Sequence, residues 1–94
     1  MAELITVRGN RAPVSPIGEV FTVDELQNLV DGWIGILPTL HGVLVFDDDG
    51  QYKDKYMNFE ATRLVKEYYE SIGEEWNDFI AGNAVLCERG MISV

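Results

Sequence analysis

Cysteine is nearly absent from this sequence, in which Cys87 is the single example. One cysteine cannot form a disulfide bond within the chain, and this favours a reducing compartment. Long apolar runs are also missing, since no stretch approaches the roughly 20 residues that span a bilayer. The opening residues, MAELITVRGN, lack the basic segment and the apolar run of a signal peptide. We therefore expect a soluble cytosolic protein with no membrane partner.

Basic side chains are scarce, with 7 Lys and Arg residues against 16 Asp and Glu residues and a formal net charge of −9. Binding to nucleic acid phosphates requires clustered Lys and Arg side chains, so nucleic acid is not expected as a direct partner. The acidity promotes solubility, and it also suits a partner protein with a basic surface. The composition leaves both interpretations open.

The chain contains no complete motif for a metal or a nucleotide. Residues 47–50 (DDDG) suggest a calcium loop, but an EF-hand with Gly50 at its sixth position would begin at Val45 and end at Tyr56. Neither residue is the acidic ligand that those positions require. No phosphate-binding glycine loop is present either. We therefore expect no bound metal and no cofactor.

The only apparent pair of a nucleophile and a base is Cys87 with His41. A reactive cysteine needs an electropositive setting, whereas Glu88 follows Cys87 directly. Zinc needs three or four nitrogen or sulfur ligands, and this chain offers two. The sequence predicts a buried structural cysteine, a loop histidine and no enzymatic activity.

Two short apolar runs form the centre of the sequence, at residues 33–37 (WIGIL) and 43–46 (VLVF). Runs of this kind between Gly, Pro and Asp are typical of buried strands. Together they predict a hairpin. Gly50 is expected to provide a positive φ angle in the turn that follows.

Two amphipathic helices flank this hairpin. Thr22 with Glu25 forms a capping box at the start of the first helix, and Gly32 is expected to end it. The second helix is expected to start after an N-cap at Asn58 and to end at Gly73. Its apolar residues recur at the spacing of one helical face.

The predicted order of elements is βαββαβ within a single domain, residues 1–94. The outer strands are expected at residues 4–7 and 79–87, with an irregular connection around Pro13 and a short edge strand or frayed end at residues 91–94. Two helices need an apolar sheet face to cover, which predicts an α+β two-layer sandwich with both helices on one face. The order matches the ferredoxin-like plan or a related one, with an antiparallel or mixed sheet.

The segment between the hairpin and the second helix combines carboxylates with exposed aromatic side chains, a composition common in binding loops. The predicted binding residues are Asp47, Asp48, Asp49, Tyr52, Tyr56 and Asn58.

Three stretches and one asparagine together resemble a family of short proteins from phages and mobile elements, known as a domain of unknown function. They are residues 31–38 (DGWIGILP), residues 43–50 (VLVFDDDG), Asn58 and residues 80–86 (IAGNAVL). The resemblance spans residues 4–86. It implies expression in a bacterial host cytoplasm and assigns no reaction.

These observations favour a small acidic accessory protein that binds a host or defence protein with a basic surface and modulates or inhibits it. Its acidic surface would imitate the charge of nucleic acid. The alternative is a homo-oligomer that sequesters a small ligand such as a nucleotide signal, with Lys53, Lys55 or Arg63 meeting phosphate. Open strand edges also make a homodimer a reasonable expectation.

Overall fold

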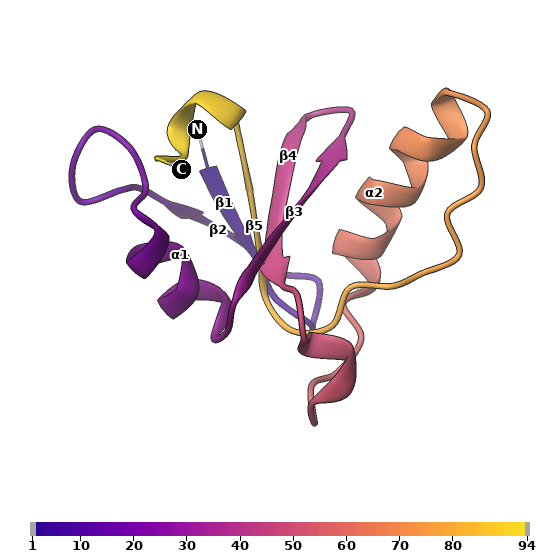
Figure 1. The fold of residues 1–94 in the computed structure, drawn as a ribbon, viewed down its shortest axis with the longest axis horizontal. Coiled ribbons are helices and arrows are strands. Elements are labelled where there is room, and N and C mark those ends of the chain that lie inside the picture. Colours follow the sequence, from indigo (N-terminus) through magenta and orange to yellow (C-terminus); the bar gives the residue numbers. More distant parts are fainter. Residues whose placement is uncertain (1, 94) are drawn as a thin grey trace.

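The structure, a computed structural model, describes residues 2–93 (Figure 1). Its strands are β1 (Ala2–Ile5), β2 (Arg11–Val14), β3 (Ile34–Thr39), β4 (Gly42–Asp47) and β5 (Ala84–Cys87). The α-helices are α1 (Val23–Val30) and α2 (Phe59–Ser71). Two short 3₁₀ helices, η1 (Gly50–Tyr52) and η2 (Arg89–Met91), follow β4 and β5.

All five strands form one antiparallel sheet in the order β2-β1-β5-β4-β3. The predicted central hairpin is confirmed, because Ile34 pairs with Asp47 and Thr39 pairs with Gly42. The α+β class is also confirmed. The βαββαβ order is wrong, since the chain runs β1-β2-α1-β3-β4-α2-β5 and places its last strand in the middle of the sheet.

The additional strand is β2, in the segment that was expected to be irregular. Thr6 N donates to Asn10 O at 2.9 Å, and Gly9 has a φ of 86°, so the chain reverses there into a hairpin. Pro13 argued against a strand because it has no backbone N–H. β2 lies at the edge of the sheet, where a proline costs no ladder hydrogen bond when its nitrogen faces outward.

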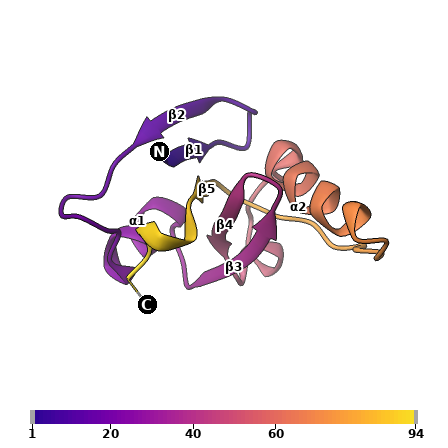
Figure 2. The same cartoon turned by 90° about the horizontal axis from the view of Figure 1, so that it is seen from above.

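The two helices lie on opposite faces of the sheet, so the prediction that both cover one face is wrong (Figures 1 and 2). Val43, Val45 and Val85 pack with α1 residues in one core cluster. Leu44 and Leu86, which alternate with them along the strands, pack with α2 residues in a second cluster. Alternate side chains of a strand point to opposite faces, so β4 and β5 are buried on both sides.

The helix starts agree with the predictions. The Thr22 hydroxyl accepts from Glu25 N at 3.2 Å, and the Glu25 carboxylate accepts from Thr22 N at 3.1 Å. The end of α1 differs, because Asp31 rather than Gly32 takes the left-handed conformation, at φ 57°. Gly73, with a φ of 74°, follows α2 as expected.

Three predictions about the loops and the C-terminal part need correction. Gly50 does not have a positive φ angle; a Cβ atom there would lie 2.7 Å from Ala81 O, so close packing requires the glycine. The last strand is limited to β5. No edge strand forms at residues 91–93: Met91 ends η2, and Ile92 forms only an isolated parallel bridge with Phe21. Residue 94 lies outside the described residues. None of the helices within residues 2–93 has the length and apolar character needed to span a membrane.

Candidate functional site

The six predicted binding residues occupy three separate environments. Asp47 and Asn58 are buried. Asp48, Asp49 and Tyr52 line one groove. Tyr56 lines a different pocket. The exposed part of the predicted site is therefore smaller than the sequence suggested.

Asp47 ends β4 with a side chain that has no exposed surface. Its carboxylate accepts from Lys55 Nζ at 2.7 Å, from Lys53 Nζ at 2.8 Å and from Asp49 N at 3.1 Å. Burial alone would raise the pKa of this carboxyl, but these hydrogen bonds outweigh the burial and hold the pKa below its usual value. Asp47 is therefore a structural charge rather than a surface ligand.

The residue opposite this carboxylate is Gly32. A Cβ atom at position 32 would lie 2.3 Å from Asp47 Oδ1, which is far inside van der Waals contact. The glycine that was expected to end α1 through its backbone freedom instead makes room for the buried Asp47 side chain.

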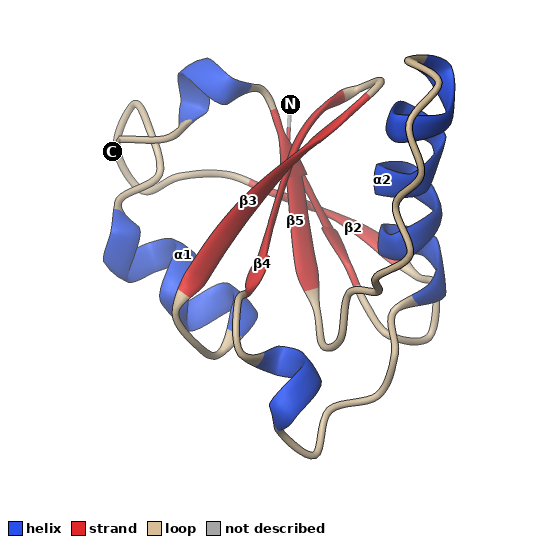
Figure 3. Cartoon of the chain, turned by 45° about the vertical axis from the view of Figure 1, so that its right-hand side comes forward, coloured by secondary structure: helices blue, strands red, loops and turns tan. Residues whose placement is uncertain are grey.

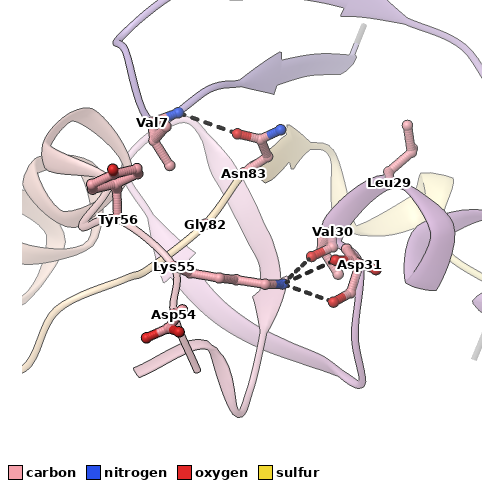
Figure 4. A pocket seen from close by; sticks show the side chains of 9 residues that line it. All are labelled: Val7, Leu29, Val30, Asp31, Asp54, Lys55, Tyr56, Gly82 and Asn83. Carbon is pink, nitrogen blue, oxygen red and sulfur yellow. Dashed lines mark hydrogen bonds and ion pairs between the residues drawn. The ribbon is translucent and has the colours of Figure 1, made fainter. Parts of the chain in front are cut away.

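Lys55 connects Asp47 to the end of α1. Figure 4 shows the contacts of Lys55 with Val30 and Asp31 from the adjoining pocket. Its ammonium group donates to Val30 O at 2.9 Å and to Asp31 O at 2.7 Å, which are carbonyls at the C-terminus of the helix. A cation is favourable there because the last carbonyls of a helix carry partial negative charge. Tyr56 also lines this pocket, which has a volume of about 250 Å³.

Asn58 is completely buried and caps α2, as the sequence predicts for the helix start. Its Oδ1 accepts from Ala61 N at 3.0 Å, while its Nδ2 donates to Ile5 O at 3.0 Å and to Gly82 O at 2.9 Å. The amide thus joins α2 to β1 and to the segment before β5. No part of it is available to a binding partner.

The strongest candidate site is an acidic groove of about 410 Å³ on the α2 side of the sheet. Three carboxylates line it, from Asp48, Asp49 and Asp78, and none of its lining residues is basic. Asp48 and Asp49 follow β4, whereas Asp78 comes from the connection between α2 and β5. Both segments meet here because Gln51 Nε2 donates to Asp78 Oδ1 and, at 3.0 Å, to Phe79 O.

Aromatic side chains surround the carboxylates of this acidic groove. Tyr52 is 85% exposed, and Trp76 stacks on Tyr69 with an interplanar angle of 11° and a centroid distance of 6.1 Å. Phe46 and Phe79 complete the aromatic lining. Carboxylates attract a cationic side chain, and aromatic faces add a favourable contact with it. The acidic groove is therefore suited to Lys or Arg side chains of another protein.

Sequence reasoning missed the part of the acidic groove that comes from Trp76, Asp78 and Phe79. Residues 74–78 (EEWND) were visible as an acidic connection with a tryptophan. No local pattern indicated that this connection returns to the end of β4, because the contact joins segments 27 residues apart, Gln51 with Asp78.

The cations that the ligand-sequestering alternative requires already have partners. Lys53 and Lys55 pair with Asp47, and Arg63 pairs with Glu60 at 2.8 Å and with Glu67 at 3.3 Å. A phosphate would compete with these carboxylates for each cation. The geometry therefore favours the acidic groove over a phosphate site.

Cys87 and His41 occupy the environments that the sequence predicts. Cys87 is buried in β5, and burial raises the pKa of its thiol. His41 is exposed in the turn between β3 and β4, with Nε2 3.6 Å from a Glu67 carboxylate oxygen. Among residues 2–93, no group of three or more His, Cys, Asp or Glu side chains is arranged to hold a metal ion.

Comparison of the chain with protein-family models, with curated proteins and with solved structures found no match. The interpretation of the site consequently depends on its own geometry.

Proposed function

We propose that this chain is a small acidic accessory protein that binds a basic surface of a host or defence protein in the bacterial cytoplasm and modulates or inhibits it. The observation that carries the proposal is the acidic groove, in which Asp48, Asp49 and Asp78 lie among aromatic side chains without a basic lining residue. A net charge of −9 speeds the encounter with a basic partner. The phage and mobile-element setting comes from the sequence resemblance alone.

The acidic groove also supports the idea of charge imitation. A protein surface that binds nucleic acid presents clustered Lys and Arg side chains. In our proposal the three carboxylates of the groove take the place of phosphates on that surface, and Tyr52 supplies a rigid aromatic contact of the kind found in binding hot spots. Asp47 has no part in this contact, since its charge is buried.

The test is affinity capture from a bacterial lysate with a variant that neutralises the groove, Asp48→Asn with Asp49→Asn and Asp78→Asn. A matched control changes three other exposed carboxylates, Glu19→Gln with Asp54→Asn and Glu70→Gln. We expect a basic protein that the wild type and the control retain, that the groove variant loses, and that salt releases. Equal loss in both variants would show that only net charge matters, and retention by the groove variant would contradict the proposal.

A further inference from the structure

The unpaired edge of β3 has two backbone N–H groups directed away from the sheet. Asp48 N donates to Trp33 O at 2.7 Å, so Trp33 and Asp48 form a hydrogen-bonded pair just before the strand begins. Antiparallel pairs alternate between hydrogen-bonded and non-hydrogen-bonded. In the register of this hairpin, Ile34 and Ile36 therefore turn their N–H and C=O groups outward. β3 is the last strand of the sheet, and Figure 3 shows it along the outside.

The other edge of the sheet, β2, is less open to an added strand. Thr6 and Asn10 form a hydrogen-bonded pair at 2.9 Å, so Arg11 and Pro13 are the outward-facing residues of β2. Pro13 has no N–H group, and a proline at this place blocks strand addition. On β3, the only outward proline is Pro38, close to the far end of the strand.

Gly35 is the position on β3 at which an added strand would run beside a carboxylate. Gly35 has no side chain, and the Phe46 ring and Asp48 Oδ1 cover its Cα, at 2.8 Å and 3.0 Å from the ideal Cβ position. Trp33, which is 70% exposed, lies two residues before Gly35 and therefore points to the same face of the sheet. A neighbouring strand would place one residue beside Gly35, next to a carboxylate and between aromatic rings.

The charges around this edge determine which segment fits. Asp48 and Asp49 are exposed at the end of β4, and Asp31, which precedes β3, has a side chain that is 96% exposed. A second copy of this acidic chain would bring like charges together at the edge. A basic segment would instead find opposite charges there.

We propose that β3 is a docking edge to which an extended basic segment of the partner protein adds as a further strand, with an Arg or Lys side chain beside Gly35. This inference rests on the proposed function, because it assigns the mode by which the same basic partner binds. Backbone hydrogen bonds to Ile34 and Ile36 give the register, and the carboxylates select the charge.

The test is amide hydrogen exchange of the wild-type protein, measured by NMR with a peptide of alternating valine and arginine as the probe. We expect the Ile34 and Ile36 amides to exchange at least about tenfold more slowly with the peptide, and the outward Arg11 amide of β2 to remain unchanged. A peptide of alternating valine and glutamate serves as the control and should protect neither amide.

A pair of variants provides a second measurement. Ile36→Pro removes the outward N–H and the side chain, whereas Ile36→Ala removes the side chain alone. We expect the proline variant to bind the arginine peptide at least about tenfold more weakly than the alanine variant. Circular dichroism verifies that both variants are folded.

Distinct results overturn the inference and the proposed function. In one result, salt and the groove variant weaken peptide binding while the Ile34 and Ile36 amides stay unprotected from exchange. That result overturns strand addition and supports the acidic groove as the binding site. Absence of binding at low salt overturns both. Protection that rises with protein concentration in the absence of peptide shows that a second copy occupies the edge, and it overturns the basic segment as occupant.

Discussion

At the scale of single residues, Asp47 shows how one buried charge organises several segments. Its carboxylate gathers Lys53 and Lys55, and Lys55 continues to the carbonyl groups that end α1. A buried ion pair offers little net stability over an apolar replacement, but removal of one partner leaves the other charge uncompensated. The segment after β4 thus depends on Asp47 for its place against α1.

Asp47→Asn should destabilise the protein strongly. The asparagine retains an acceptor for Asp49 N but leaves the Lys55 ammonium group, whose side chain is 16% exposed, without its buried counterion. We expect a cost of about 3 kcal/mol in the free energy of unfolding. Urea denaturation measures this cost. Asp48→Asn, at the neighbouring exposed position, should change the free energy of unfolding by less than about 0.5 kcal/mol. Similar changes in the free energy of unfolding for the two substitutions would show that the buried ion pair of Asp47 does not contribute to stability beyond an exposed carboxylate.

The same residue marks a limit of prediction from sequence. Asp47, Asp48 and Asp49 are chemically identical. Asp47 is the last residue of β4 and is buried near Gly32, whereas Asp48 and Asp49 lie beyond the strand and are exposed. The glycine was visible in the sequence, but its relation to Asp47 depends on how the hairpin places α1. Local patterns do not contain that information.

At the scale of elements, the two helices illustrate what local sequence predicts well. Both N-caps and the central hairpin were predictable because their signals lie within a few residues of one another. The placement of the helices on opposite faces was missed, although β4 and β5 carry a relevant signal. Their continuous apolar runs, VLVF and AVLC, are typical of strands covered on both faces, whereas strands with one solvated face alternate.

Asn58→Ala should cost far more than an ordinary N-cap loss. It removes the cap of α2, worth about 1 kcal/mol, and it also leaves Ile5 O and Gly82 O without the donor that satisfies them. We expect a total of at least about 3 kcal/mol by chemical denaturation. Thr22→Ala, which removes the cap of α1 at an exposed site, should cost about 1 kcal/mol.

Asn58→Asp separates the two roles of this side chain. The carboxylate still accepts from Ala61 N but cannot donate to the two carbonyl groups, so the variant should remain well below the wild type in stability. Stability equal to that of the wild type would show that capping alone accounts for Asn58.

At the scale of the whole molecule, carboxylates outnumber basic groups, so lowering the pH is the most direct way to test how charge affects stability. Glu60 links α2 to β2 through Arg11, and hydrogen bonds from Arg63 and Arg11 lower the pKa of Glu60 from 4.5 to about 2. A carboxyl group whose pKa is lowered on folding stabilises the folded state above its unfolded pKa. This contribution disappears as the pH falls through the folded pKa.

The stability that Glu60→Gln loses relative to the wild type should therefore become smaller in acid. We expect the variant to be less stable than the wild type at pH 7 and the difference to shrink between pH 4.5 and about 2, where the wild-type carboxyl becomes protonated. Thermal unfolding across this range measures the difference. Comparison of the two proteins at each pH removes the common effect of net charge, and a constant difference would contradict the proposed pairing.

The central position of β5 has a consequence for how the chain reaches its fold. The hairpins β1-β2 and β3-β4 can each form from neighbouring residues, but β5 alone joins them into one sheet. β5 comes last among the strands of residues 2–93. We therefore expect a nascent chain to hold two separate hairpins, with apolar faces exposed, until residues 84–87 leave the ribosome. Because exposed apolar faces attract chaperones, we expect the unfinished chain to meet them most often in that interval.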